Sequence, residues 1–146
     1  MLKTKQTVGV VVFQNDSVLI IKHLKKAGHL TGTFGLPAGR PNKNEILIKT
    51  AKRELKEETG LTTDIEELFE FPGNDYIGSI KRKDEENIIM PYKIFICLTF
   101  RGKLKSSKET LPEFIKITEL KKYNLLPNVE KIIRDAYKYL KINGIL

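Results

Sequence analysis

The chain has 146 residues, of which 40% are hydrophobic and 30% charged, and its formal net charge is +8. This length predicts a single domain over residues 1–146, able to bury a core without a disulfide or a structural metal. No apolar run approaches the roughly 18 residues of a membrane-spanning helix, so we expect no membrane contact. The N-terminus lacks a small-residue cleavage site, which argues against export. With Cys97 as the single cysteine, a reducing cytoplasm is expected.

The basic residues are spread along the chain rather than gathered in one segment. Their groups are Lys22-Lys25-Lys26, Lys81-Arg82-Lys83, Lys103-Lys105-Lys108 and Lys121-Lys122. This spread is typical of a solvated surface, and it also suits attraction to a polyphosphate-bearing partner, small or large.

The first half of the chain predicts a hairpin, a long loop and a helix. Residues 8–13 and 18–22 are β-rich runs joined by four polar residues, which indicates a hairpin. Residues 23–44 carry too many Gly and Pro residues for a helix and predict a shaped loop with a short strand near Phe34. Residues 45–59 have an apolar stripe at helical spacing, with Asn44 as the expected N-cap and Gly60 ending the helix.

The second half predicts strands followed by a terminal helix. The strands are expected over residues 62–71, 88–100 and 113–117. Asn128 is the expected N-cap of the last helix, whose apolar face includes Ile132 and Ala136 and which closes near residues 143–144. A sheet with one internal and one C-terminal helix predicts an α+β fold, or an α/β/α sandwich with a mixed central sheet.

Three glutamates of the internal helix form a cluster. At about 100° per residue, Glu54, Glu57 and Glu58 fall in one sector beside the apolar stripe, whereas the lysines take another sector. Like charges at this spacing destabilise a helix unless a cation joins them. Oxygen ligands without histidine or cysteine favour Mg²⁺, with Mn²⁺ as an alternative. The competing interpretation is an exposed helix face, on which Arg53 pairs with Glu57 and Glu45 with Lys49.

Gly39 to Leu61 resembles the Nudix box, G-x5-E-x7-R-E-U-x-E-E-x-G-U with U aliphatic, at every specified position. The fixed residues are Gly39, Glu45, Arg53, Glu54, Glu57, Glu58 and Gly60, and the aliphatic positions hold Leu55 and Leu61. The order of the flanking elements is also similar to that of a Nudix domain. The resemblance implies a Nudix-like α/β/α sandwich over the whole chain, with the box helix as the catalytic helix.

The resemblance also implies roles for individual residues. Glu54, Glu57 and Glu58 would bind Mg²⁺ together with the carbonyl of Gly39. Arg53 would orient a catalytic glutamate by ion pairing, and Glu45 would brace the junction of loop and helix. Members of the family often use a further acidic residue from a downstream loop. We choose Glu109 for this role over Glu113, the alternative being that Glu109 is an ordinary exposed acid.

The implied reaction is hydrolysis of a pyrophosphate bond in a nucleotide. Metal ions would neutralise charge on the phosphates while a carboxylate positions the attacking water. We expect a small-molecule substrate, foremost a (d)NTP as in the MutT-like branch, and a monomer or homodimer. The alternatives are RNA 5′ ends, which the basic charge would suit, dinucleoside polyphosphates or ADP-ribose, and a non-catalytic nucleotide-binding module.

Some residues depart from the family pattern or carry no function. Ala38 stands where many Nudix domains have a glycine before Gly39, and Tyr76 stands where many ADP-ribose hydrolases have proline. His23 and His29 have no second nitrogen or sulfur ligand at metal spacing, so we interpret both as loop histidines. The residues that bind the base or sugar are not identified from the sequence.

Overall fold

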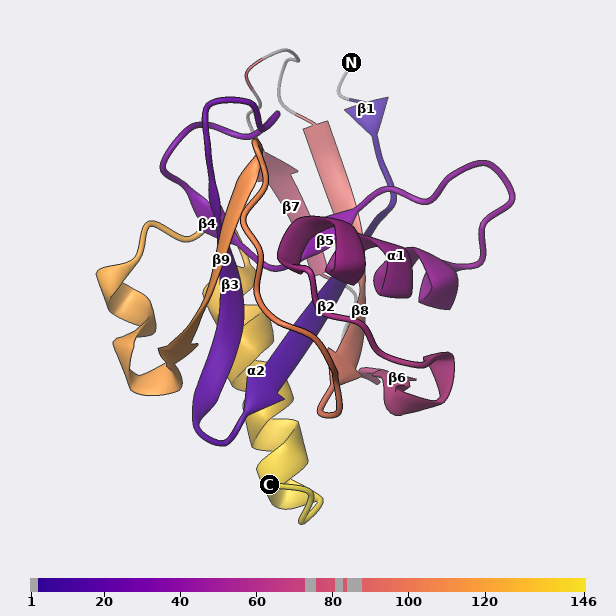
Figure 1. Cartoon of the computed structure of the whole chain (residues 1–146), viewed down its shortest axis with the longest axis vertical. Helices are drawn as coiled ribbons and strands as arrows, with labels where there is room; N and C mark the ends of the chain where they lie inside the picture. The colour runs from indigo at the N-terminus through magenta and orange to yellow at the C-terminus, as the bar shows by residue number, and fades with distance from the viewer. Residues whose placement is uncertain (1–2, 73–75, 81–82, 84–87) are drawn as a thin grey trace.

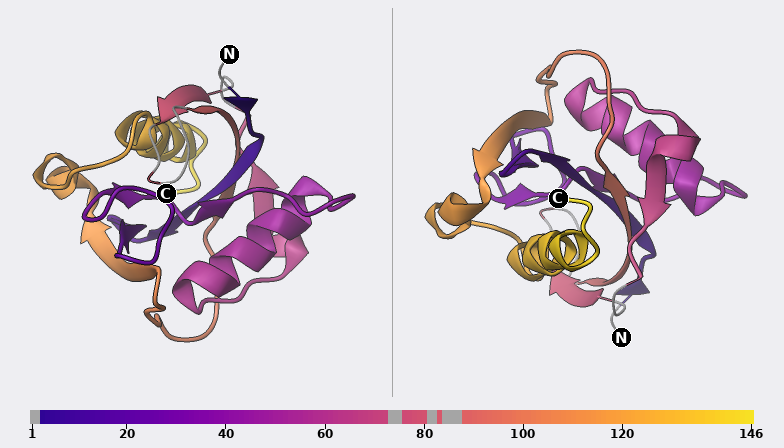
Figure 2. Two further views of the ribbon diagram at one scale, coloured as in Figure 1. Left: turned by 90° about the horizontal axis from the view of Figure 1, so that it is seen from above. Right: turned by 90° about the horizontal axis from the view of Figure 1, so that it is seen from below.

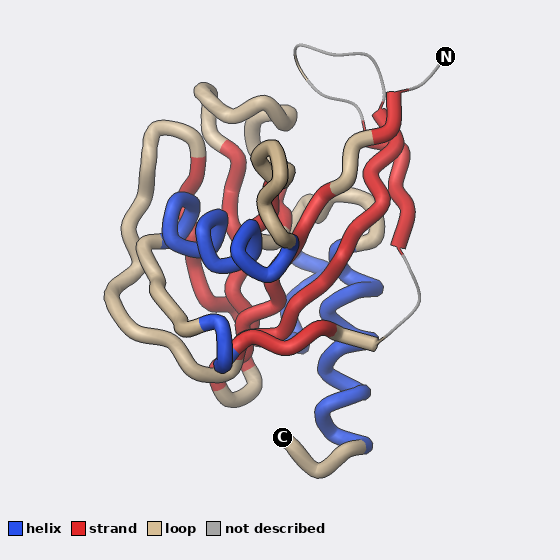
Figure 3. Tube along the Cα trace, turned by 90° about the vertical axis from the view of Figure 1, so that its right-hand side faces the viewer, coloured by secondary structure: helices blue, strands red, loops and turns tan. Residues whose placement is uncertain are grey.

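The computed structural model describes residues 3–72, 76–80, 83 and 88–146, in which one mixed β-sheet lies between two helices (Figures 1 and 2). Helix α1 (Leu47–Thr59) covers one face, and helix α2 (Val129–Ile142) covers the other. In Figure 3 the strands pass between these two helices. The expected α/β/α sandwich is therefore confirmed. None of the helices in these residues is long and apolar enough to cross a bilayer.

The sheet is built around two long parallel strands. Strand β2 (Thr7–Gln14) pairs with β8 (Ile88–Cys97), from Thr7 opposite Tyr92 to Val12 opposite Cys97. The remaining strands are β1 (Lys3–Thr4), β3 (Ser17–His23), β4 (Phe34–Gly35), β5 (Ala38–Gly39), β6 (Leu68–Glu70), β7 (Tyr76–Ile80) and β9 (Thr110–Lys116). The main path runs β1-β8-β2-β3-β4, with β5 on β2, β6 and β7 on β8, and β9 on β3. Two 3-10 helices, η1 (Ile65–Glu67) and η2 (Ile117–Lys122), complete the fold.

Strand β2 shows why both faces of the sheet need a helix. Successive side chains of a strand point to opposite faces, so Val8, Val10 and Val12 pack with α1, while Val11 and Phe13 face the α2 side. All five side chains are buried. A strand that is apolar at almost every position is stable only when both of its faces are covered. The run of valines therefore specifies a sandwich rather than a sheet with one solvated face.

The ends of both helices differ in part from the prediction. Helix α1 begins at Leu47 after Ile46, because Asn44 adopts a left-handed conformation (φ 63°) that places it in a turn before the helix. Gly60 ends this helix as predicted, with φ 84°. Asn128 holds the N-cap position of α2, but its side chain does not cap the helix. Its amide nitrogen instead donates to the carbonyl oxygen of Ile77, 2.8 Å away.

Several strand limits were predicted incorrectly. Of residues 62–71 only Leu68–Glu70 form a strand, because Ile65–Glu67 form the 3-10 helix η1 closed by a hydrogen bond from Glu67 to Asp64. Strand β8 ends at Cys97 rather than residue 100, and β9 begins at Thr110 rather than residue 113. The short strands β1 and β7 were not predicted. Cys97 is a buried free thiol.

Candidate active site

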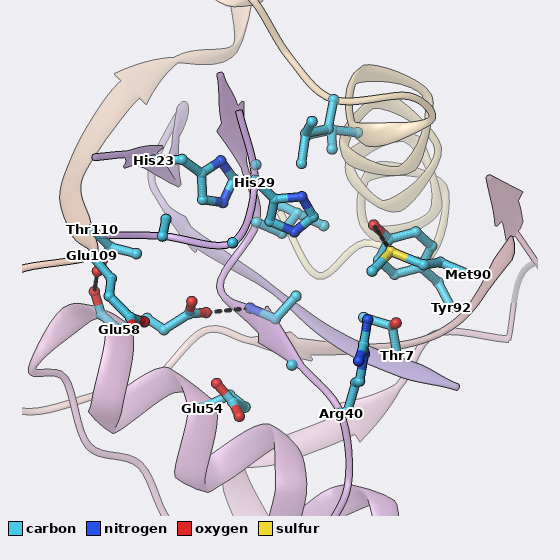
Figure 4. Close-up of a pocket in the computed structure, with 18 of the residues that line it drawn as sticks. Thr7, His23, His29, Arg40, Glu54, Glu58, Met90, Tyr92, Glu109 and Thr110 are labelled. Carbon is cyan, nitrogen blue, oxygen red and sulfur yellow. Dashed lines mark hydrogen bonds between the residues drawn. The ribbon is translucent and has the colours of Figure 1, made fainter. Parts of the chain in front are cut away.

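A pocket of about 340 Å³ lies where α1, the segment after β3, β8 and the start of α2 meet (Figure 4). Its acidic side is formed by Glu54 and Glu58 of α1 and by Glu109, which precedes β9. Across the pocket in Figure 4 lie Thr7, Arg40, Met90 and Tyr92. One wall is thus negatively charged, and the opposite wall combines apolar surface with polar groups.

Glu58 joins the last turn of α1 to strand β5. Its Oε1 accepts a hydrogen bond of 2.7 Å from the backbone amide of Ala38 (Figure 4). Burial raises the pKa of Glu58 well above its usual range, and the charges of Glu54, Glu109 and Glu57 act in the same direction. The Ala38 amide opposes this shift, because it stabilises the carboxylate. Its burial in the pocket therefore disfavours a negative charge on Glu58.

Glu54 packs directly against the backbone of Gly39. Only 13% of its side chain is exposed, and burial raises its pKa, although Arg53 acts in the opposite direction. A Cβ atom on Gly39 would overlap the Glu54 carboxylate. A larger residue at position 39 would therefore displace the Glu54 carboxylate, although the backbone conformation of Gly39 does not itself require glycine.

The guanidinium of Arg53 connects the helix to the segment before it. Its two-point contact with Glu45 is made by Nε and Nη2, each 2.9 Å from a carboxylate oxygen. Nη1 donates to Glu54 at 2.6 Å and to Glu57 at 3.2 Å, and Nη2 also donates to the carbonyl of Arg40 at 3.0 Å. These contacts use all five N–H groups of an arginine side chain. Arg53 thus fixes the loop, the helix and two of the glutamates relative to one another.

Glu57 lies apart from the other two glutamates of α1. Its side chain is 56% exposed and pairs with Arg53, and it is absent from the residues that line the pocket. Glu57 is three residues after Glu54, and its partner Arg53 is four residues before it on the same helix side. The structure therefore brings Glu54 and Glu58 into the pocket, while Glu57 remains in the ion pair that the alternative interpretation described.

Glu109 reaches the pocket from the loop before β9. Its carbonyl oxygen accepts a hydrogen bond of 2.8 Å from the amide of Leu24, next to β3. Glu113, the other candidate, is an exposed residue within β9 and does not line the pocket. The position of Glu109 follows from the β3–β9 pairing, in which Thr110 lies opposite His23.

The interpretation of His23 as a loop histidine was wrong. His23 is the last residue of β3, is 4% exposed, and lines the pocket together with His29. Its Nδ1 lies 3.1 Å from both the carbonyl oxygen and the hydroxyl oxygen of Thr33. Because a carbonyl only accepts, Nδ1 carries the hydrogen. The strand was expected to end one residue earlier, which is why His23 was assigned to the loop.

Other residues of the pocket come from distant parts of the sequence, and no local motif marks them. They include Thr7 of β2, Met90 and Tyr92 of β8, and Leu126 and Val129 near the start of α2. Tyr76, a position of interest for substrate class, does not line this pocket. Its hydroxyl donates to Asp135 of α2 at 2.9 Å, and burial together with this hydrogen bond raises the pKa of Tyr76.

The donors of the pocket fit a hard divalent cation. Mg²⁺ and Mn²⁺ prefer carboxylate and carbonyl oxygens, and a cation would relieve the unfavourable charge on Glu58. Glu54 and Glu58 would hold such an ion, with Gly39, Glu57 and Glu109 as further donors. In the described part of the chain, no three His, Cys, Asp or Glu side chains already converge on an ion position. Three-carboxylate binding of an ion would therefore involve side-chain movement, for example of Glu57 away from Arg53.

The sandwich fold and the box residues around its pocket agree with the comparisons with known proteins. A model of the NUDIX domain family matches residues 3–139. The chain therefore belongs to the Nudix family.

Two relatives are similar to the chain in sequence, and a solved structure shares its fold. ADP-ribose pyrophosphatase of Methanocaldococcus jannaschii is 28% identical over 130 residues, which cover 88% of this chain and 70% of that protein. 8-oxo-dGTP diphosphatase of Buchnera aphidicola is 24% identical over 137 residues, which cover 94% of this chain and 95% of that protein. The MutT Nudix hydrolase structure from Burkholderia pseudomallei has a TM-score of 0.71 at 18% identity. The match covers 90% of this chain and 97% of that chain.

Two further relatives, 38% and 30% identical over shorter segments, are longer proteins. The chain spans 17% and 27% of their lengths.

Proposed function

We propose that this chain is a Mg²⁺-dependent hydrolase, with Mn²⁺ as an alternative ion, that cleaves a pyrophosphate bond in a nucleotide. The observation that carries the proposal is the convergence of Glu54, Glu58 and Glu109 on one pocket beside the backbone of Gly39. Nudix hydrolases generally use divalent metal ions, and the complete Nudix box of this chain supplies carboxylates that could bind such an ion. A binding module would not require this set of carboxylates.

The two walls of the pocket would bind different parts of the substrate. The acidic wall would receive the phosphates together with the ion, which supplies charge neutralisation when bound. The opposite wall, with Met90, Tyr92 and Leu126, would receive the nucleoside part. A volume of about 340 Å³ is at the lower end of the range for small-molecule sites and suits one nucleotide unit.

In the proposed reaction, a water oxygen forms a bond to phosphorus as the bridging P–O bond breaks. A carboxylate of the acidic wall takes the proton of the water, and the leaving phosphate carries away the electron pair. Arg53 would hold Glu54 in place and would pair with Glu57 until that carboxylate moves to the ion, and its contacts with Glu45 and the Arg40 carbonyl would keep it in position. A (d)NTP would yield a nucleoside monophosphate and pyrophosphate.

A (d)NTP is the substrate class we favour. In support, 8-oxo-dGTP diphosphatase is similar over 94% of the chain and 95% of its own length, and a MutT structure shares the fold. ADP-ribose is the second candidate, because the relative named ADP-ribose pyrophosphatase is similar over 88% of the chain. Both substrates place a pyrophosphate bond next to a nucleoside, so the acidic wall would serve either one.

A substrate panel tests this proposal. It comprises the canonical and oxidised (d)NTPs, ADP-ribose, dinucleoside polyphosphates and RNA with a 5′ triphosphate, each with Mg²⁺ and with EDTA. We expect Mg²⁺-dependent release of a nucleoside monophosphate, with the highest kcat/KM for a (d)NTP. A preference for ADP-ribose or RNA would replace the substrate class and retain the reaction. No turnover on any member, despite nucleotide binding, would favour a binding module.

A further inference from the structure

A chain of hydrogen bonds connects Glu109 with the end of α1. The hydroxyl oxygen of Ser107 accepts hydrogen bonds from the backbone amides of Glu109, at 3.1 Å, and Thr110, at 3.0 Å. The hydroxyls of Ser107 and Thr110 lie 3.2 Å apart, and the hydroxyl of Thr110 donates to the carbonyl of Glu58 at 2.9 Å. The amide of Ser107 also donates to the carbonyl of Thr110 at 2.9 Å.

The hydrogens of the two hydroxyls can be assigned in one direction only. A carbonyl cannot donate, so the single hydrogen of the Thr110 hydroxyl is used on Glu58. The hydroxyl of Thr110 must therefore accept from Ser107, whose two lone pairs accept the two amides. The bonds form a directed series from the Glu109 amide through Ser107 and Thr110 to Glu58.

This series fixes the backbone of Glu109 on one side, and the Leu24 amide fixes it on the other by donating to the Glu109 carbonyl. Thr110 is 2% exposed, so its hydroxyl is held in a dry environment where losing a partner is costly. Ser107 is exposed, which means that it can be changed without creating a cavity. Two small hydroxyls outside the Gly39 to Leu61 box therefore hold the backbone from which the Glu109 side chain extends toward Glu58.

We propose that Ser107 and Thr110 are positioning residues that set Glu109 beside Glu58 and thereby set the affinity of the pocket for a divalent cation. The inference rests on the proposed metal-dependent function and adds two residues to it. The hydrogens of both hydroxyls are used within this series, so we assign both residues a role through the backbone. Partners that orient metal ligands commonly change metal affinity by 10- to 100-fold when removed.

The test is binding of Mn²⁺ to the purified chain, measured from the free-ion signal in electron paramagnetic resonance. We expect Ser107→Ala to weaken Mn²⁺ binding by about 10-fold, the lower end of that range. Ser107→Thr, which keeps the hydroxyl, should restore the affinity. Ser106→Ala is the matched control, because this neighbouring serine is exposed and the hydrogen bonds to the Glu109 amide and the Glu58 carbonyl come from Ser107 and Thr110. Equal affinity of Ser107→Ala and wild type would overturn the inference.

A double-mutant cycle separates positioning from general loosening of the loop. If Ser107 acts through Glu109, adding Ser107→Ala to Glu109→Gln should produce no further loss of Mn²⁺ affinity. A further loss of about 10-fold in that background would contradict the inference, because Ser107 would then act by another route. Failure of the wild type itself to bind Mn²⁺ would overturn the proposed metal-dependent function, a result distinct from equal binding by wild type and variant.

Discussion

Arg53 and Glu45 form a two-point ion pair in which both oxygens of the carboxylate are 2.9 Å from a guanidinium nitrogen. Glu45 also accepts hydrogen bonds from the amide of Asn42 and the hydroxyl of Thr50. Together these donors lower the pKa of Glu45 to about 2, with the Arg53 hydrogen bonds as the largest cause. The first turn of α1 is thereby tied to the loop that carries Gly39.

The Glu45 pair predicts a loss of stability in acid. The folded-state pKa is below the ordinary value of 4.5, so the unfolded chain binds the proton first and the pair stabilises the fold above that value. As pH falls from about 4.5 to about 2, this contribution disappears. Denaturant unfolding of wild type and Glu45→Gln should therefore differ most at neutral pH and converge near pH 2. Glu113→Gln, at an exposed position on β9, serves as the control and should follow the wild type throughout.

Loss of the Glu57 carboxylate should inactivate the protein without unfolding it. The side chain of Glu57 is 56% exposed and pairs with Arg53, so Glu57→Gln removes charge and little packing. If Glu57 moves from Arg53 to the ion during the reaction, turnover should fall by at least about 10²-fold. The measurement is kcat at saturating Mg²⁺, with circular dichroism as the check on folding. Glu66→Gln, at an exposed position on η1, should retain full turnover; equal rates for the two variants would refute the role of Glu57.

Helix α1 and the grouping of its glutamates could be predicted from the sequence, because both depend on local residue spacing. The apolar stripe, the absence of Gly and Pro, and Gly60 as the helix end are properties of adjacent turns, and the helix over Leu47–Thr59 has them. The start was misplaced because asparagine favours turns as well as caps. Asn44 uses its tolerance of positive φ in the turn, and Ile46 takes the N-cap position.

The opposite wall of the pocket was beyond prediction from sequence for a different reason. Thr7, Met90 and Leu126 meet there because β2 and β8 are parallel neighbours and α2 crosses behind them. No local pattern encodes that juxtaposition, since it is a property of the strand order. The separation of Glu57 from Glu54 and Glu58 was also missed. Helical spacing predicts the direction of the Cα–Cβ bond of Glu57, but the ion pair with Arg53 determines where the Glu57 carboxylate lies.

Glu58 predicts an unusual response of the metal-free chain to pH. Burial raises its folded-state pKa, so ionisation is opposed by the fold, and stability should decline as pH rises from about 4.5 through the raised value. Glu58→Gln keeps an oxygen for the Ala38 amide and removes the charge. In EDTA at pH 8 this variant should therefore melt above the wild type.

Addition of Mg²⁺ should reverse the order of the melting temperatures of wild type and Glu58→Gln. The ion neutralises the carboxylate in the wild type, so its melting temperature should rise, whereas Glu58→Gln should gain little. Scanning calorimetry with EDTA and with Mg²⁺ makes the comparison. A Glu58→Gln variant that is less stable than the wild type in EDTA would show that the buried charge is already compensated.

Gly39→Ala tests the contact between the loop and Glu54. The added Cβ would overlap the Glu54 carboxylate, so the side chain must leave its position beside Arg53 and the pocket. Gly39 does not have a positive φ, and alanine therefore introduces a collision without backbone strain. We expect Mn²⁺ affinity to fall by at least about 10-fold.

Ala38→Gly, one residue earlier, is the control for Gly39→Ala. It keeps the amide that contacts Glu58 and should bind Mn²⁺ as the wild type does. Parallel titrations of the two variants would distinguish a specific displacement of Glu54 from general sensitivity of this loop, because the latter would weaken binding in both.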